Sequence, residues 1–196
     1  MGEYTKLRKK ALEVLRTELS AKLTYHDIGH TLDVFNVCNL YIEREIIGEA
    51  EAELLRIAAL LHDIGFTVTY RSHEEKGAEI ASRIMTRFSY TPKEIEVVQG
   101  LIMATKIPQS PTNFLEQILC DADLDYLGRS DFPSISEKLF QELLSFSFIE
   151  NREIWNKTQI KFLEKHSYHT DFAKNNRQPE KERRIAELKQ LVATGT

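Results

Sequence analysis

Apolar residues recur every three or four positions along most of the chain, which is the spacing that places them on one face of an α-helix. No stretch shows the sustained alternation of apolar and polar residues that is typical of a β-strand, and only eight Gly and five Pro interrupt the pattern. The pattern therefore predicts an all-α protein. Its expected helices cover residues 7–19, 31–47, 50–64, 72–88, a segment that starts at 91, 113–127, 134–147, 151–165 and 179–192.

Two of these helix starts carry the sequence of a capping box, in which Ser or Thr is followed three residues later by Glu. Ser72 with Glu75 forms one pair, and Thr91 with Glu94 forms the other, with Pro92 at the first helical position. We expect each hydroxyl to accept a hydrogen bond from the backbone N–H three residues on.

Composition narrows the class of protein. Hydrophobic residues make up 42% of the chain and charged residues 29%, as in ordinary soluble globular proteins. The net charge of −4 argues against a dedicated nucleic-acid binder, and no apolar run approaches the roughly 18 residues needed to cross a bilayer. Cys38 and Cys120 are far apart in apolar stretches, which indicates buried free thiols in a reducing compartment. We therefore expect a cytoplasmic protein whose partners are neither nucleic acid nor membrane.

The last segment, residues 179–196, is highly charged but carries Ile185, Leu188 and Val192 on one helical face. We expect two parts in the chain, residues 1–178 and residues 179–196. The apolar stripe of the second part would either dock on the first or pair with a second copy in a homodimer.

Histidines are the most informative residues for chemistry. His26 and His30 stand four apart, so they would share one face if the segment opens the second helix. His62 and Asp63 follow the apolar run 57–61 and so begin inside the core, where an unpaired carboxylate or imidazole is costly. A divalent cation would satisfy both groups, and a hydrogen-bonded pair at the helix end is the alternative.

An acidic cluster lies at residues 118–128. A helix over 113–127 places Asp121 and Asp125 on one face, whereas Asp123 falls on the apolar side with Leu119 and Tyr126. An Asp on an apolar face again needs a partner, which makes Asp123 a candidate metal ligand.

The order and spacing of His30, His62, Asp63 and Asp123 resemble the HD superfamily of metal-dependent phosphohydrolases. The local sequences Leu-Leu-His-Asp-Ile-Gly and Asp-Ala-Asp-Leu-Asp-Tyr-Leu-Gly are similar to the central and late motifs of small stand-alone members. The resemblance implies a single all-α HD domain of about eight to ten helices, with these four residues as metal ligands. It also implies that Asp63 both holds the metal and orients the attacking water.

The segment Tyr25-His26-x-x-x-His30 is in turn similar to a motif of mammalian-type cyclic nucleotide phosphodiesterases, which share the HD metal core. That similarity implies His26 as a general acid and His30 as a ligand. Asp27 departs from the Asn that those enzymes carry.

Members with two metals take further ligands from the region of His73 and Glu74. Thr105 and Lys106 stand where many of them place His, so one tightly bound metal is favoured, with a weaker second one as the alternative. Two imidazoles and two carboxylates suit Mn, Fe, Zn, Co or Ni better than Ca, and suit Mg only if the histidines are weak ligands. Phosphate would need cations, and those nearest the motifs include Lys76, Lys106 and Arg129.

The expected activity is hydrolysis of a phosphoester of a nucleotide or related small molecule by metal-activated water. The alternative is a catalytically silent HD domain that binds metal or nucleotide and acts as a signalling or interaction module. Oxygen-dependent di-iron chemistry is a third reading, which the absence of a His near Thr105 disfavours.

Overall fold

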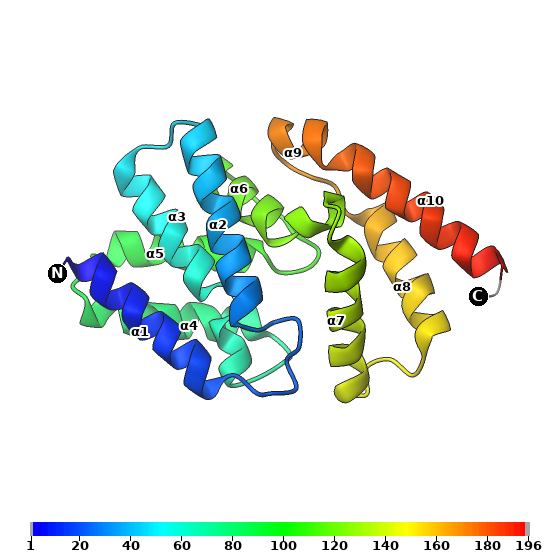
Figure 1. Cartoon of the computed structure of the whole chain (residues 1–196). Helices are drawn as coiled ribbons and strands as arrows, with labels where there is room; N and C mark the ends of the chain where they lie inside the picture. Colours follow the sequence, from blue (N-terminus) through cyan, green and yellow to red (C-terminus); the bar gives the residue numbers. More distant parts are fainter. Residues whose placement is uncertain (1, 195–196) are drawn as a thin grey trace. The chain divides into compact units, whose positions relative to one another are not determined.

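The computed structural model describes residues 2–194 (Figure 1). Across this range the regular structure consists of ten α-helices and two short 3-10 helices, with no strand, which confirms the predicted all-α class. The helices are α1 (Glu3–Glu18), α2 (Ile28–Arg44), α3 (Glu49–Leu61), η1 (Ile64–Thr67), α4 (His73–Arg87), α5 (Pro92–Ala104), α6 (Phe114–Asp123), η2 (Asp125–Gly128), α7 (Phe132–Ser145), α8 (Arg152–Lys165), α9 (Asp171–Asn176) and α10 (Gln178–Thr194). Among the described helices, none combines the length and the apolar character that a membrane span requires.

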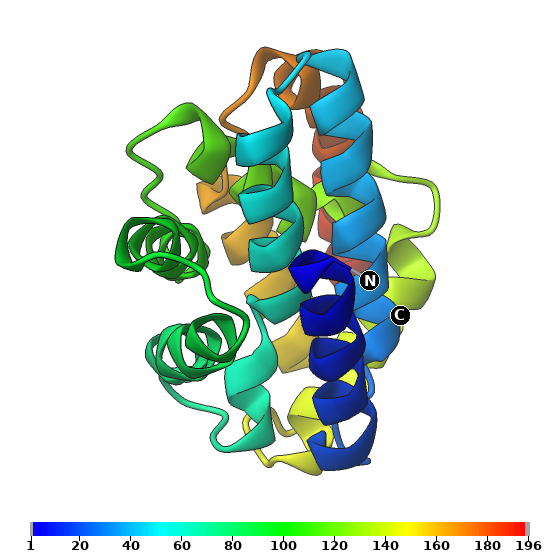
Figure 2. The ribbon, with the colours of Figure 1, turned by 90° about the vertical axis from the view of Figure 1, so that its left-hand side faces the viewer.

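The chain divides into two compact units, and the first covers Met1–Asp123. Its centre is α3, whose residues from Ile57 to Leu61 are fully buried because α1, α2, α5 and α6 all pack against this helix. Figure 2 shows α1, α2 and α3 running in one general direction, with α4 and α5 lying crosswise to them. A helix buried on several sides delivers the residues at its end into the core, and here those residues are His62 and Asp63.

The second unit covers Leu124–Thr196. Its α7 and α8 enclose an apolar cluster of Phe140, Ile149 and Trp155, and α10 packs against α8, α9 and η2. In the structure α10 therefore belongs to this unit, and a separate role for residues 179–196 stays a prediction.

Two predicted helices end earlier than the periodicity indicates. The helix expected over 50–64 stops at Leu61, and that expected over 113–127 stops at Asp123. A 3-10 helix follows each one, and each contains a glycine in close contact with another backbone: a Cβ on Gly65 would lie 1.9 Å from the carbonyl oxygen of His73, and one on Gly128 would lie 2.3 Å from that of Arg177. The expectation that Asp121 and Asp125 share a helical face is therefore wrong, because Asp125 lies beyond the helix.

The two capping boxes have different outcomes. Thr91 accepts a hydrogen bond from the Glu94 N–H, and the Glu94 carboxylate accepts one from the Thr91 N–H, as predicted. The box at Ser72 is wrong, because this residue adopts a left-handed backbone conformation with φ 54° and its side chain makes no capping hydrogen bond. Glu75 instead forms an ion pair with Lys106.

Candidate metal centre

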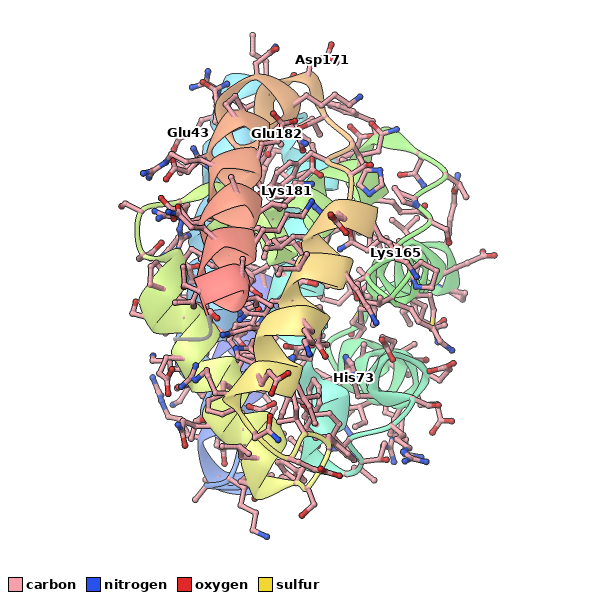
Figure 3. The ribbon with its side chains drawn as sticks, turned by 90° about the vertical axis from the view of Figure 1, so that its right-hand side faces the viewer. Glu43, His73, Lys165, Asp171, Lys181 and Glu182 are labelled. Carbon is pink, nitrogen blue, oxygen red and sulfur yellow. The ribbon has the colours of Figure 1, made fainter. Side chains whose placement is uncertain are left out.

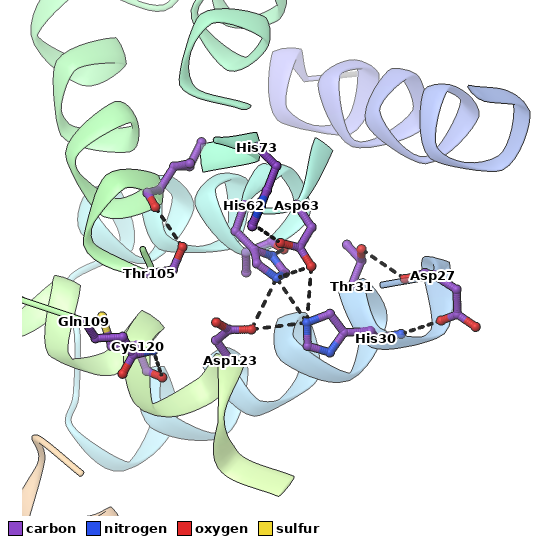
Figure 4. A network of polar contacts seen from close by, with 12 residues as sticks. Asp27, His30, Thr31, His62, Asp63, His73, Thr105, Gln109, Cys120 and Asp123 are labelled. Atoms are coloured by element: carbon purple, nitrogen blue, oxygen red, sulfur yellow. Dashed lines mark hydrogen bonds and ion pairs between the residues drawn. The ribbon is translucent and has the colours of Figure 1, made fainter. Parts of the chain in front are cut away.

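Four side chains meet in the core of the first unit: His30 lies in α2, His62 and Asp63 directly follow α3, and Asp123 ends α6 (Figure 4). The N-cap of α2 sets the position of His30, because the Asp27 carboxylate accepts a hydrogen bond of 2.9 Å from the His30 N–H. The Nε2 atom of His30 then lies 3.1 Å from Asp123 Oδ1, 3.3 Å from His62 Nε2 and 3.4 Å from Asp63 Oδ2. The structure thus brings together the four residues that the sequence singled out as ligands.

A backbone contact decides which nitrogen His62 presents to the cluster. The Nδ1 atom of His62 lies 2.9 Å from the Ala59 carbonyl oxygen, which can only accept a hydrogen bond. Nδ1 therefore carries a proton, and in the neutral ring Nε2 is left with a lone pair. That atom lies 3.2 Å from Asp63 Oδ2 and 3.5 Å from Asp123 Oδ1. Such a second hydrogen bond is the usual way in which proteins orient a metal-binding imidazole.

The donor set fits a divalent cation. Ligand atoms of His30, His62 and Asp123 all lie within 4.8 Å of one another, and Asp63 Oδ2 approaches both imidazoles. This Oδ2 atom is buried and meets no donor in good hydrogen-bond geometry, and its neighbours are the Nε2 atoms of His62 at 3.2 Å and His30 at 3.4 Å. Its charge therefore has to be compensated by protonated imidazoles or by a cation. Two carboxylates would balance the charge of a divalent ion, and the two imidazoles complete a mixed nitrogen and oxygen set.

In the absence of an ion, protonated imidazoles balance the charge of the two carboxylates. Burial by itself would lower the pKa of His30, but the hydrogen bond with Asp123 and the contact with the Asp63 carboxylate outweigh it and raise the pKa to about 9. Burial also opposes charge on His62, and Asp63 with Asp123 raises its pKa as well. The same contacts hold the pKa values of Asp63 and Asp123 below the ordinary range although burial would raise them. Opposite charges thus compensate one another, and a metal ion would take the place of the imidazole protons.

His73 joins the cluster from the first turn of α4. Its Nε2 atom lies 3.4 Å from Asp63 Oδ1, and its Nδ1 atom lies 3.5 Å from Glu74 Oε2. Burial would lower the pKa of His73, but the contact with Asp63 raises it. The close approach at Gly65 places this turn beside the residues that follow α3. Sequence reasoning missed the role of Gly65, although a glycine two residues after an expected ligand was the available signal.

His26 lies outside α2, because this helix begins at Ile28. The condition under which His26 and His30 would share one helical face is therefore not met. The two rings are nevertheless close, with their centroids 5.9 Å apart, and the His26 ring stacks on Phe66 at a centroid distance of 4.3 Å.

The predicted phosphate-binding cations are already in ion pairs. Lys76 pairs with Glu79, and Lys106 pairs with Glu75. Arg129 belongs to the second unit, where it contacts Asp131 and Asp125. Thr105, which stands where two-metal proteins place His, donates its hydroxyl hydrogen to the Ile102 carbonyl within α5. A role of Lys76, Lys106 and Arg129 in phosphate binding therefore stays a prediction.

Comparison with known protein families gives one match. The model of the HD domain family matches residues 27–125, about half of the chain, and this stretch contains all four residues of the cluster. Neither the curated proteins nor the solved structures gave a match.

Proposed function

Because the chain belongs to the HD domain family, whose members are generally metal-dependent phosphohydrolases, we propose that it hydrolyses a phosphoester of a nucleotide or a related small molecule. The observation that carries the proposal is the convergence of two imidazoles and two carboxylates, in which the buried Oδ2 atom of Asp63 faces the Nε2 atoms of His30 and His62 without good hydrogen-bond geometry. That set is suited to a divalent cation, whereas buried ionisable side chains stabilise a protein core less well than apolar side chains would.

His30, His62, Asp63 and Asp123 would hold the ion. When bound, a divalent metal supplies positive charge to a phosphoryl oxygen and makes a water molecule a stronger nucleophile at neutral pH. Mn, Fe, Zn, Co and Ni match the mixed donor set, and the arrangement does not choose among them.

The two oxygens of Asp63 face different partners. Oδ2 points to the imidazoles of His30 and His62, whereas Oδ1 lies near the Nε2 atom of His73. In the proposed site, Oδ2 would bind the ion, and Oδ1 with His73 would orient the attacking water by hydrogen bonds. Asp63 is thereby both a ligand and a catalytic residue.

His26 is the proposed general acid. Its ring is half-buried beside the cluster and close to His30, but it is not part of the group of atoms that could hold an ion. An imidazole in this position can give a proton to the departing oxygen of the ester without losing a metal contact.

The test is metal removal and replacement in the wild type, in Asp63→Ala and in a control, Asp171→Ala, whose side chain is 98% exposed in the second unit. Bound metal is measured by elemental analysis. Turnover is measured on paired phosphodiester and phosphomonoester substrates after chelation, with Mg, Mn, Co, Ni or Zn added back. We expect metal-restored turnover in the wild type and the control, and loss of both bound metal and turnover in Asp63→Ala, because even removal of a residue that only orients a ligand lowers metal affinity by about 10–100-fold.

A wild-type metal content in Asp63→Ala would contradict the assignment of the ligands. Stoichiometric metal with no turnover on any ester would favour the alternative function, an HD domain that binds metal or nucleotide without catalysis. The preferred ester would decide between diester and monoester chemistry.

A further inference from the structure

An aromatic group lies against the candidate metal centre in the first unit. Phe66 is buried in η1, and two imidazole rings stack on its phenyl ring. The His26 ring lies at a centroid distance of 4.3 Å with an angle of 28° between the planes, and the His73 ring lies at 3.9 Å with an angle of 21°. Tyr70 contacts the same phenyl ring edge-on at 5.0 Å. One phenyl ring therefore contacts both histidines that lie beside the four ligands.

The position of Phe66 is coupled to that of Asp63 through the backbone. The Phe66 N–H donates a hydrogen bond of 3.0 Å to the Asp63 carbonyl oxygen, which closes the first turn of η1. Gly65, between them in this turn, touches the backbone of His73 at the start of α4. The turn that presents the Asp63 carboxylate thus also fixes where the phenyl ring stands.

His26 needs such a support because it precedes α2. A residue before the helix N-cap lacks the repeating backbone hydrogen bonds that restrict a helical side chain, so contacts of the ring itself must select its rotamer. Stacked aromatic rings prefer a limited set of distances and tilts, and a buried phenyl ring in close packing has little freedom to move.

We propose that Phe66 is a positioning residue: its ring sets the planes of the His26 and His73 imidazoles relative to the Asp63 carboxylate. The inference rests on the proposed function, in which His26 is the general acid and His73 contacts Asp63. Phe66 touches neither the reacting atoms nor the ion, and it acts only through the two histidines.

The inference predicts a specific pattern in the kinetics of Phe66→Leu. Metal content stays at the wild-type level, because no ligand is removed. For esters with a poor leaving group, kcat falls by about tenfold to a hundredfold, because proton donation depends on the placement of His26. For esters with a good leaving group kcat falls less, and KM changes little for either. Phe66→Tyr retains the stacking ring and restores most of kcat.

The matched control is Phe140→Leu. Phe140 is 5% exposed and Phe66 is 6% exposed, so both variants remove a buried phenyl ring, but Phe140 lies in the apolar cluster of the second unit. A general loss of stability would affect both variants, whereas a change in leaving-group dependence is expected only for Phe66→Leu.

A second readout needs neither metal nor turnover. In wild-type protein prepared without metal, ring protons of His26 and His73 are measured by NMR after selective labelling of histidine. Protons over the face of a phenyl ring resonate upfield of those in a free histidine. We expect this upfield shift for both residues in the wild type and in Phe66→Tyr. In Phe66→Leu we expect its loss for His73 and a clear decrease for His26, whose ring keeps the Tyr25 ring as a neighbour at 4.6 Å.

The outcomes separate the inference from the proposed function. Upfield shifts together with a leaving-group-dependent loss in Phe66→Leu would support the inference. If the wild type hydrolyses the esters but its His26 protons are unshifted, the inference is overturned and the phosphohydrolase function stands. The same holds if the wild type is active and Phe66→Leu loses activity equally on both ester types. The absence of metal-restored turnover in the wild type would overturn the function and, with it, the role of Phe66. If Phe66→Leu does not fold, the wild-type shifts and Phe66→Tyr still decide the placement of His26.

Discussion

Asp63 contacts other residues of the candidate metal centre through both of its carboxylate oxygens. The sequence places it at the end of the most apolar helical run, which already indicates that its charge needs a partner. The structure adds that its two oxygens have separate partners, with the imidazoles of His30 and His62 on one side and His73 on the other. One oxygen is thereby available for an ion while the other can hold a hydrogen bond.

His26 gives a prediction at the same scale. His26→Ala is expected to retain metal, because the ring is not among the ligand atoms, and to lower kcat by about 10²-fold or more on an ester with a poor leaving group. The loss should be smaller when the leaving group departs without a proton. Metal analysis and kcat on paired alkyl and nitrophenyl esters provide the measurement, with His169→Ala in the second unit as a control. Equal losses on the two esters would show that His26 does not act as the acid.

At the scale of elements, the short helix η1 decides the geometry of the site. It turns the chain directly after His62 and Asp63, and Gly65 within it lets the first turn of α4 approach. Helical periodicity gave no sign of this turn, because the residues of 50–64 are nearly all good helix formers. The helix nevertheless ends at Leu61, and the 3-10 helix that follows packs against α4. Ser72, directly before α4, has a left-handed backbone conformation that local propensity did not indicate either.

Gly65→Ala tests this close approach. A Cβ 1.9 Å from the His73 carbonyl oxygen cannot be accommodated without moving backbone, so we expect a loss of about 2–4 kcal/mol in the free energy of unfolding. Gly100→Ala is the matched control, because it lies inside α5 and the nearest atom to a Cβ there is 3.5 Å away. Ala is the better helix former, and this variant should gain about 0.5–1 kcal/mol. Urea unfolding measures both, and equal effects of the two substitutions would argue against the close approach.

At the scale of the whole molecule, the second unit contains a charge that the candidate metal centre does not use. Lys181 of α10 is 1% exposed, and Figure 3 shows it on the side of this helix that faces α8. Its Nζ atom donates a hydrogen bond of 2.5 Å to the His166 carbonyl oxygen and lies 5.4 Å from the centre of the Tyr168 ring. Burial lowers the pKa of Lys181 to about 8.

This shift makes stability depend on pH in a defined direction. Between about pH 8 and pH 10 the unfolded chain keeps the Lys181 proton that the folded chain has lost, so the free energy of unfolding rises with pH in this window. Lys181→Met removes that contribution. Relative to the wild type, the variant should lose about 1–2 kcal/mol of stability between pH 7 and pH 9.5. Urea unfolding at both pH values gives the difference, and a difference that does not change with pH would contradict the buried, shifted amine.

The sequence by itself determined the helical class and the burial of the helix that precedes His62, and its resemblance to the HD superfamily indicated the four candidate ligands. The helical class and the buried helix follow from local patterns, because a period of 3.6 residues and a charged group after an apolar run can be recognised within a short stretch. The ligand set follows from the order and spacing of four residues, which resemble a known family. Only the tertiary structure decided that His30 and Asp123, 93 positions apart, meet at 3.1 Å and that His26 reaches His30 from outside the helix. It also decided that Phe66 stacks with two histidines. Such contacts depend on how α2, α3, α4 and α6 pack and on where two 3-10 helices turn the chain, and no single segment of the sequence contains that information.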